Sequence, residues 1–333
     1  MITLHVGLHK TGSSSIQLFL EHWSAPAGTT VVVPRAGNEH DLPSIRRRFE
    51  AVADHRQVIW SDENLLGTPF DGYRDAPERI RLIHEFLRSR GGRVIVYVRP
   101  QFTWLPSVYT QLVQIGGTAS SSDFWAGIRE SPWLRWSALV SHLRDALGAE
   151  NVAVIAYAPQ SAVLDFCTVT GIPPSDRAEE YRENASITAV QVPLLAAVNA
   201  LTTSPSARHL ARSRFQLELR PGAARGFSVF PSDVQQDILD TFRQDWQQLA
   251  DLASTDQASR FAEIVQSWPT TVMPFAGDDI HHEPVAAEAL RSLALLSGTS
   301  PEDQRTGMLS RVARAARHPR RTMGRIMRVI RAH

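Results

Sequence analysis

A lysine and a run of hydroxyl side chains stand near the start of the chain. Lys10, Thr11 and Gly12 are followed by three serines, Ser13, Ser14 and Ser15. An ammonium group, several hydroxyl donors and a glycine that lets the backbone approach a ligand closely are suited to binding an anion. If a helix begins here, its first backbone N–H groups and the positive end of its dipole strengthen that capacity. The segment therefore predicts an anion-binding loop.

The residues on either side predict the elements that would hold this loop. Residues 2–7 are typical of a short strand, and apolar positions recur at helical spacing from Ile16. The alternative is an ordinary strand–turn–helix in which a serine caps the helix. We favour anion binding because Lys10 and Gly12 follow the strand in register. His9 is expected to be a structural residue or a donor to the anion, whereas His5 lies inside the strand and is expected in the core.

The loop differs from the Walker A loop of nucleotide-binding proteins. Gly7 and Gly12 have the glycine spacing of that pattern, but Ser13 stands where its lysine would be. The lysine of this chain, Lys10, comes before the second glycine.

Charged residues also follow two other predicted strands. Arg99 ends an apolar strand at 94–98, and Ser107 lies in the helix predicted after it, where Pro106 should kink the helix or delay its start. The string Ser61-Asp62-Glu63-Asn64 follows the strand at 57–60. Ligands of open α/β sheets bind beyond the carboxyl ends of the strands, so these residues are expected to converge on one site. A guanidinium group suits phosphate oxygens, and a carboxylate can take a proton from a hydroxyl group.

Strands alternate with helices over the first half of the chain. This order predicts an α/β fold, with a central parallel sheet of about five strands and helices on both faces. The predicted strands are 2–7, 30–33, 57–60, 94–98 and 151–157. One predicted helix begins at Ile16, and three more lie between later strands, at 42–53, 77–90 and 102–115. A further helix, at 161–170, follows the last strand. Only helical patterns follow, at 187–201, 206–217 and 231–252, so the C-terminal half is expected to be helical.

Three stretches resemble motifs of one enzyme family. The string VGLHKTGSSSIQ resembles the 5′-phosphosulfate loop of sulfotransferases that use 3′-phosphoadenosine 5′-phosphosulfate (PAPS), especially bacterial carbohydrate-type members. VYVRPQFTWLPSVYTQLVQ resembles the 3′-phosphate motif, and SDEN resembles the acidic strand-end motif of carbohydrate sulfotransferases. The resemblance is specific over 1–115, moderate over 220–252 and absent elsewhere. It implies the P-loop-like sulfotransferase fold.

The resemblance also implies a reaction and roles for residues. A sulfuryl group would pass from PAPS to a hydroxyl of a carbohydrate or other small alcohol, leaving PAP, without a metal. Lys10 would neutralise charge on the bridging oxygen, and Glu63 would be the general base. The 5′-phosphate would be held by His9, Lys10, Thr11, Gly12, Ser13, Ser14 and Ser15. Arg99 and Ser107 would hold the 3′-phosphate.

Two assignments stay open at this level. Asp62 or a histidine could be the base in place of Glu63. The string RPGAARGFS at 220–228 resembles a basic loop that often closes over the 3′-phosphate in this family, with Arg225 and Gly226 as its candidates, but it could equally be a solvated loop.

Composition narrows the functional classes. The 333 residues carry a net charge of +1, so bulk charge does not indicate a polyanion-binding protein, and no nucleic-acid motif is present. The single cysteine, Cys167, excludes an internal disulfide and predicts a buried thiol in a reducing compartment. No signal peptide or long apolar run is evident, so a cytoplasmic protein is expected. No metal-ligand spacing appears; the nearest group, 281–283, has adjacent residues.

Two parts are expected from the chain as a whole. Residues 1–270 would form the sulfotransferase domain, with a helical lid and substrate region at 119–148 and 175–230. Residues 271–333 would form a helical extension whose tail carries nine arginines and no acidic residue from 305 onward. This amphipathic tail could pack on the domain or contact an anionic membrane surface peripherally.

Other readings of the same residues remain. The chain could be a P-loop-like nucleotide kinase or NTPase, or a non-catalytic PAP-binding protein. The partner expected for the enzyme is a small-molecule or glycan acceptor. Several aromatic residues could stack on sugar rings, although most are expected in the core: Trp104, Tyr109, Trp125, Trp133 and Trp136.

Overall fold

The computed structural model describes residues 1–34, 40–174, 187–189, 191–201 and 226–276. The chain divides into two compact units. The first consists of Met1–Trp104, Ile128–Glu183 and Asp240–Trp268, and the second of Leu105–Gly127, Asn184–Leu239 and Pro269–His333. The predicted helix at 206–217 and the predicted basic tail lie outside the described residues.

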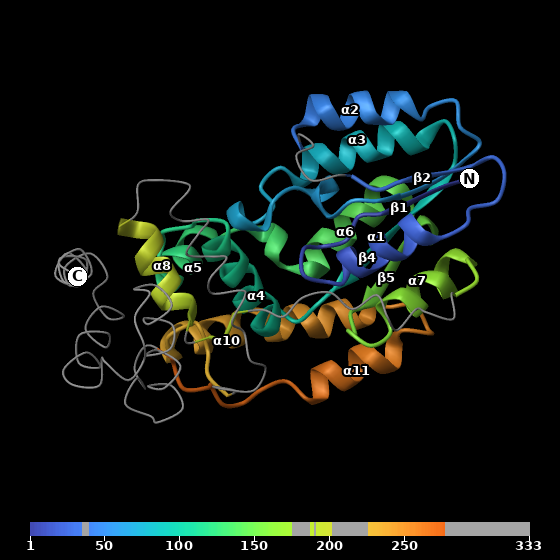
Figure 1. The fold of residues 1–333 in the computed structure, drawn as a ribbon. Helices are drawn as coiled ribbons and strands as arrows, with labels where there is room; N and C mark the ends of the chain where they lie inside the picture. The colour runs from blue at the N-terminus through green and yellow to red at the C-terminus, as the bar shows by residue number, and fades with distance from the viewer. Residues whose placement is uncertain (35–39, 175–186, 190, 202–225, 277–333) are drawn as a thin grey trace, which may run out of the picture. The chain divides into compact units, whose positions relative to one another are not determined.

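A five-stranded sheet forms the centre of the first unit (Figure 1). Its strands are β1 (Ile2–His5), β2 (Thr29–Val32), β3 (Gln57–Ser61), β4 (Gly92–Val98) and β5 (Val152–Ala156). They lie in the order β2-β3-β1-β4-β5 and all neighbours are parallel. The prediction of an α/β fold with a parallel sheet of about five strands is confirmed.

The register of the strands brings their carboxyl ends to one edge. His5, the last residue of β1, lies opposite Ser61 of β3 and Ile95 of β4. At the end of β4, Val98 lies opposite Ala156 of β5. The segments that follow β1, β3, β4 and β5 therefore leave the same edge of the sheet.

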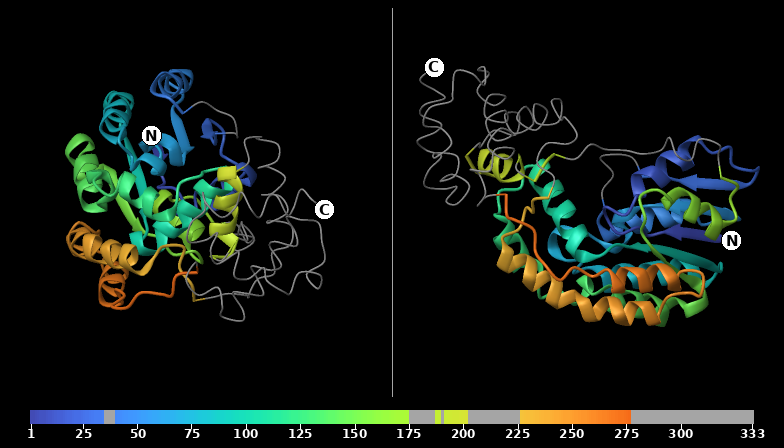
Figure 2. Two further views of the ribbon diagram at one scale, coloured as in Figure 1. Left: turned by 90° about the vertical axis from the view of Figure 1, so that its left-hand side faces the viewer. Right: turned by 90° about the horizontal axis from the view of Figure 1, so that it is seen from below.

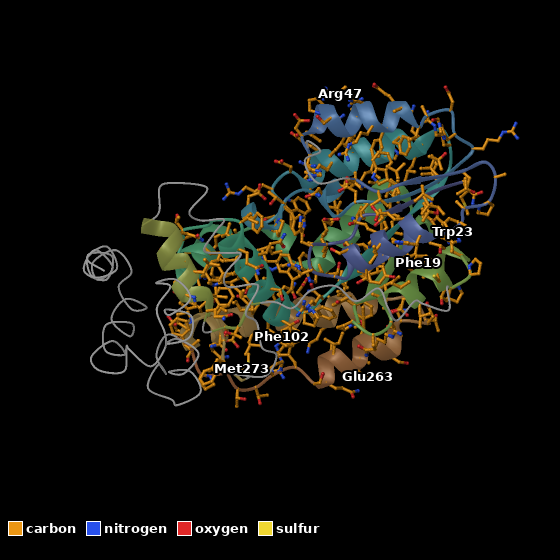
Figure 3. All side chains as sticks on the ribbon, viewed as in Figure 1. Phe19, Trp23, Arg47, Phe102, Glu263 and Met273 are labelled. Carbon is orange, nitrogen blue, oxygen red and sulfur yellow. The ribbon has the colours of Figure 1, made fainter. Side chains whose placement is uncertain are left out.

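Helices cover both faces, as predicted. On one face, α1 (Ser13–His22) and α7 (Ala162–Thr170) pack with Ile59 and other strand residues in a buried cluster that includes Phe19 and Phe166. Trp23, just after α1, packs against the same cluster (Figure 3). Side chains alternate along a strand, so Trp60 points to the other face.

The second face is covered by α2 (Leu42–Ala51) and α3 (Ala76–Arg88), and α6 (Trp136–Leu147) packs on α3 (Figure 1). Phe49 of α2 stacks on Phe86 of α3 with ring centroids 4.2 Å apart, and meets Trp60 edge-on at 5.0 Å. These contacts bury large aromatic surfaces between the helices and the sheet.

The helix after β4 begins earlier than its internal proline suggests. The helix α4 (Gln101–Gln114) includes Pro106, so the predicted delay of its start is wrong. The carbonyl of Pro100 accepts hydrogen bonds from the backbone N–H groups of Thr103 and Trp104, at 2.9 and 2.8 Å. The first turn is thus fixed before Pro106 is reached.

Two helices near the end of the described chain complete the first unit. The final part of α10 (Ser232–Asp251) lies beside α11 (Ala258–Gln266), a helix that was not expected from the sequence (Figure 2). Trp246 of α10 and Phe261 of α11 are stacked with centroids 5.6 Å apart. Short 3-10 helices connect the larger elements: η1 (Glu63–Leu66), η2 (Pro69–Asp71), η3 (Pro132–Leu134) and η4 (Ala149–Asn151).

The described part of the second unit is mainly helical. It contains most of α4 and of α5 (Ser121–Ile128), together with α8 (Gln191–Leu201) and the first part of α10. The side-chain amide of Asn199 on α8 donates to the carbonyl oxygens of Val113 and Gly117, at 2.7 and 2.9 Å. Trp125 on α5 donates to Asp237 on α10 over 2.7 Å. These bonds hold the helices of this unit together.

Candidate functional site

The loop between β1 and α1 contains two residues in the left-handed region. Gly12 has φ 82° and Lys10 has φ 64°. A Cβ at Gly12 would lie 2.9 Å from Tyr157 Cε2 and 3.0 Å from the Cβ of Ala162, so this position also requires the small residue sterically. A left-handed lysine costs about 1–3 kcal/mol. Such strain is typical of a backbone shaped for a ligand rather than for its own stability.

The first turn of α1 has no side-chain cap. Its N-cap is Gly12, and no side chain of the described residues caps the N-terminal end of the helix, so the alternative of a serine cap is wrong. The helix begins at Ser13, three residues before the predicted start. Ser13 is buried, Ser14 is exposed and Ser15 is half-buried. The N–H groups of this turn are available for an anion.

Buried aromatic side chains hold the loop in place. The indole Nε1 of Trp104 donates to the carbonyl of His9 over 2.6 Å, and the backbone N–H of His9 donates to the Tyr73 hydroxyl over 3.2 Å. The hydroxyl of Thr11 donates to the carbonyl of Leu8. His9 is buried, which lowers its pKa to about 4 and leaves the ring neutral at neutral pH. The structure therefore places His9 and Thr11 in the framework of the loop.

Arg99, directly after β4, lies against this loop. Its Nη1 donates to the backbone carbonyl of Lys10 over 3.2 Å, and its Nε donates to Thr103 Oγ1 over 3.1 Å. The guanidinium carbon lies 5.8 Å from the centroid of the Tyr157 ring. Tyr157 follows β5, so residues after three different strands meet here.

The two adjacent carboxylates after β3 have different environments. Asp62 is fully buried; one oxygen is 3.2 Å from Arg48 Nη1 and the other accepts the backbone N–H of Asn64 over 2.9 Å. Glu63 is half-buried, and its Oε2 accepts a hydrogen bond from the side-chain amide of Gln17 over 2.6 Å. The Asp62 carboxylate is therefore engaged in an ion pair and a backbone hydrogen bond. The Glu63 carboxylate is held by a neutral amide from α1.

The charges of the site act on one another. Burial lowers the pKa of the Lys10 ammonium, the Arg99 guanidinium lowers it further, and Glu63 acts in the opposite direction. Burial also lowers the pKa of Arg99. Two partly buried cations that share one field are stabilised by an added anion. The arrangement can therefore bind an anion next to a carboxylate that can accept a proton.

A second network fixes the backbone at Arg99. Trp136 donates from Nε1 to the carbonyl of Arg99 over 2.8 Å. Asp245 accepts the backbone N–H groups of Trp136 and Ser137, at 2.9 and 3.0 Å, and the side-chain amide of Gln101 at 3.0 Å. A carboxylate at the N-terminus of α6 is favoured by the helix dipole.

The remaining predicted residues lie in other parts of the chain. Ser107 is half-buried on α4, and Gly226 is exposed with φ 91°; both belong to the second unit. Arg225 lies outside the described residues. Their roles toward a 3′-phosphate stay predictions.

Several residues of the site were missed in the sequence. Tyr157 could have been found, because it is the last residue of the strand predicted at 151–157 and therefore lies at the same edge as Arg99. Gln17 lies one helical turn after Ser13 and could have been considered for the same reason. Tyr73 and Asp245 carried no signal, since each acts through contacts between distant segments.

The aromatic residues are mostly core, as expected. Trp104, Tyr109, Trp125 and Trp136 are buried, and Trp133 is half-buried. Cys167 is a buried free thiol, as predicted, and burial raises its pKa to about 11. His5 is in the core, also as predicted.

Within the described ranges, no group of three or more His, Cys, Asp or Glu side chains could hold a metal ion. Nor does any helix in these ranges combine the length and apolar character needed to cross a membrane.

Comparisons with known proteins add one structural similarity. A sulfotransferase from Alicyclobacillus acidocaldarius shares 18% sequence identity with this chain, covering 63% of this chain and 94% of its own, with a TM-score of 0.39. No protein-family model and no curated protein matches the sequence.

Proposed function

We propose that this protein is a PAPS-dependent sulfotransferase that transfers a sulfuryl group to a hydroxyl of a carbohydrate or another small alcohol. One observation carries the proposal: the Arg99 guanidinium lies against the strained Lys10 loop, at the uncapped start of α1. Two cations and an uncapped helix N-terminus lie at one edge of the sheet. This combination suits a sulfuryl donor that carries several anionic groups.

The donor would be held by this loop and by Arg99. Backbone N–H groups and hydroxyls from Thr11 to Ser15 would bind the 5′-phosphate, and Lys10 would lie at the oxygen that bridges phosphorus and sulfur. Arg99, together with Ser107, would bind the 3′-phosphate. His9 would support the loop through the bonds described above rather than carry charge.

The transfer would be an in-line displacement. The acceptor oxygen forms a bond to sulfur while the bond from sulfur to the bridging oxygen breaks, and the electron pair of that bond leaves with PAP. Lys10 stabilises the charge that develops on the leaving oxygen. Glu63 takes the proton of the acceptor hydroxyl. Catalysis then rests on placement and electrostatics, as in phosphoryl transfer.

The structure favours Glu63 over Asp62 as the base. Asp62 is buried, paired with Arg48 and used to cap η1, so taking a proton there would break those bonds. Glu63 is half-buried and acts on the pKa of Lys10, so its carboxylate is in the field of the site. Gln17 orients the Glu63 carboxylate without neutralising it.

The test compares ligands first and then turnover. Calorimetry of the full chain should show binding of PAP without a metal and no comparable binding of ATP with Mg²⁺. Incubation with labelled PAPS and a panel of glycans and small alcohols should give a product whose mass increases by one sulfuryl group. Preferential binding of ATP with Mg²⁺ would indicate a kinase or NTPase instead. Binding of PAP without any transfer would indicate a non-catalytic PAP-binding protein.

A further inference from the structure

Two buried polar atoms without a partner among the described residues lie beside Gly7, close to the anion loop. They are His5 Nε2, from the end of β1, and Ser13 Oγ, from the start of α1; neither has a hydrogen-bond partner among the described residues. A Cβ built on Gly7 would lie 2.4 Å from Ser13 Oγ and 2.8 Å from His5 Nε2. Only a glycine at this position lets the two side chains approach each other.

The orientation of the His5 ring is fixed. Its Nδ1 is 2.8 Å from the Oγ of Ser61, which is the last residue of β3. The ring meets those of Tyr97 and Phe166 edge-on, with centroids 5.3 and 5.8 Å away. Burial lowers the pKa of His5 to about 3, so the ring is neutral near pH 7 and carries a single N–H.

We propose that His5 is a positioning residue for Ser13 when an anion binds: the Ser61 hydroxyl donates to His5 Nδ1, so the ring proton is on Nε2, and on anion binding Nε2–H donates to Ser13 Oγ and leaves the hydroxyl hydrogen of Ser13 for the anion. The proposal rests on the proposed function, because it says how the hydroxyl of Ser13, a donor in the same loop, is oriented toward the phosphate. It makes His5 a support of the phosphate site, with no contact to the donor nucleotide.

The other tautomer has the opposite effect. With the proton on Nδ1, His5 would donate to Ser61, and Nε2 would accept the hydrogen of Ser13. Ser13 would then present only lone pairs to an anion, which repel it. Since Ser13 lies in the first turn of an uncapped helix that favours anions, the arrangement with Nε2–H agrees with the dipole of α1.

Nitrogen NMR of the histidine rings in the full-length protein reads this tautomer directly. The His5 signals are assigned by their absence from the spectrum of His5→Gln. We expect Nε2 protonated and Nδ1 unprotonated without ligand, and a shift of the Nε2 signal when PAP is added. A proton on Nδ1, or on both nitrogens, near pH 7 would overturn the proposal.

A double-mutant cycle with PAP affinity tests the connection between the two residues. Ser13→Ala and His5→Leu should each weaken binding by about tenfold, the scale of one hydrogen bond to a charged group. The double variant should bind PAP no more weakly than either single variant, because each substitution removes the same donor, the Ser13 hydroxyl as positioned by His5. His5→Gln, whose amide can donate from the same position, should bind within about threefold of the wild type on that scale. Fully additive losses would show that the residues act separately.

One further variant, together with the NMR result, keeps the test decisive. If His5→Leu does not fold, Gly7→Ala replaces it, since its Cβ would separate Ser13 from His5. The NMR result is obtained without PAP, so it can fail while the wild type still binds PAP, and the proposed function then stands alone. If the wild type binds no PAP, the proposed function fails, and with it the role of Ser13 toward a phosphate, whatever the tautomer.

Discussion

The guanidinium of Arg99 donates a hydrogen bond to the backbone carbonyl of Lys10 over 3.2 Å. The bond joins the segment after β4 to the loop after β1, and these strands are neighbours in the sheet. It uses one nitrogen of Arg99 to hold the strained backbone of Lys10, while Nε bonds to Thr103. The lysine and the arginine are therefore placed together by backbone geometry, before any ligand is bound.

Replacing Lys10 should remove most turnover. We expect Lys10→Ala to lower kcat by about a hundredfold or more, because one charge that stabilises the leaving oxygen is lost. Lys10→Gly should lose a similar amount of activity but be more stable than the alanine variant, since glycine tolerates φ 64°. Steady-state kinetics and thermal unfolding measure the two effects. Turnover like that of the wild type in either variant would remove Lys10 from the mechanism.

The neighbouring carboxylates should separate catalysis from stability. Glu63→Gln should lower kcat by about a hundredfold or more with little change in melting temperature, because a half-buried base is replaced by an isostere. Asp62→Asn should lower the free energy of unfolding by about 3 kcal/mol, since Arg48 loses its buried partner. The reverse pattern, with Asp62 controlling turnover in a stable protein, would exchange their roles.

The guanidinium geometry of Arg99 should matter for nucleotide affinity. Arg99→Lys keeps the charge but loses the planar fork, so we expect PAP to bind at least about tenfold more weakly by calorimetry. Arg93→Lys, in the strand β4 that precedes Arg99, is a matched control, because the guanidinium of Arg93 bonds to the carbonyl of Thr170 instead. Equal losses in both variants would indicate a general effect on β4 rather than a ligand contact.

Two buried histidines should make the protein sensitive to acid. The pKa values of His5 and His9 fall from 6.5 to about 3 and about 4 on folding, so the unfolded chain binds more protons between these values and 6.5. The free energy of unfolding that the two neutral histidines contribute is therefore present above pH 6.5. It is lost as the pH falls from 6.5 through their folded-state pKa values. Each histidine contributes about 2 kcal/mol of that loss between pH 7 and pH 5.

Urea unfolding at these two pH values measures the effect. His5→Gln should lose about half of the difference expected from the two histidines, because glutamine does not titrate. A wild-type protein with the same free energy of unfolding at both pH values would contradict the assignment of neutral buried rings.

Asp245 should stabilise the segment that carries Arg99. Its carboxylate accepts N–H groups at the start of α6 and the amide of Gln101, so Asp245→Asn turns one acceptor oxygen into a donor that faces other donors. We expect a loss of about 3 kcal/mol in the free energy of unfolding. Asp251→Asn, at the exposed end of the same helix, is the control and should be nearly neutral. Equal stability of the two variants would show that the network is dispensable.

The sequence by itself determined the α/β class and the residues that follow each strand. Apolar runs of strand length that alternate with helical periodicity predict a parallel sheet, and that sheet places the segments with Lys10, Glu63 and Arg99 at one edge. These features are local or follow from topology, so they did not require knowledge of side-chain contacts.

The tertiary structure decided which residues are free to act. That position 12 has no room for a Cβ depends on Tyr157 and Ala162, and that the Asp62 carboxylate is engaged in an ion pair depends on Arg48. The support of His9 by Tyr73 and of Arg99 by Trp136 joins segments far apart in the chain. Hydrogen bonds and packing act over a few ångströms in space, whereas a sequence pattern records only separation along the chain, so these partners appear only once the chain is folded.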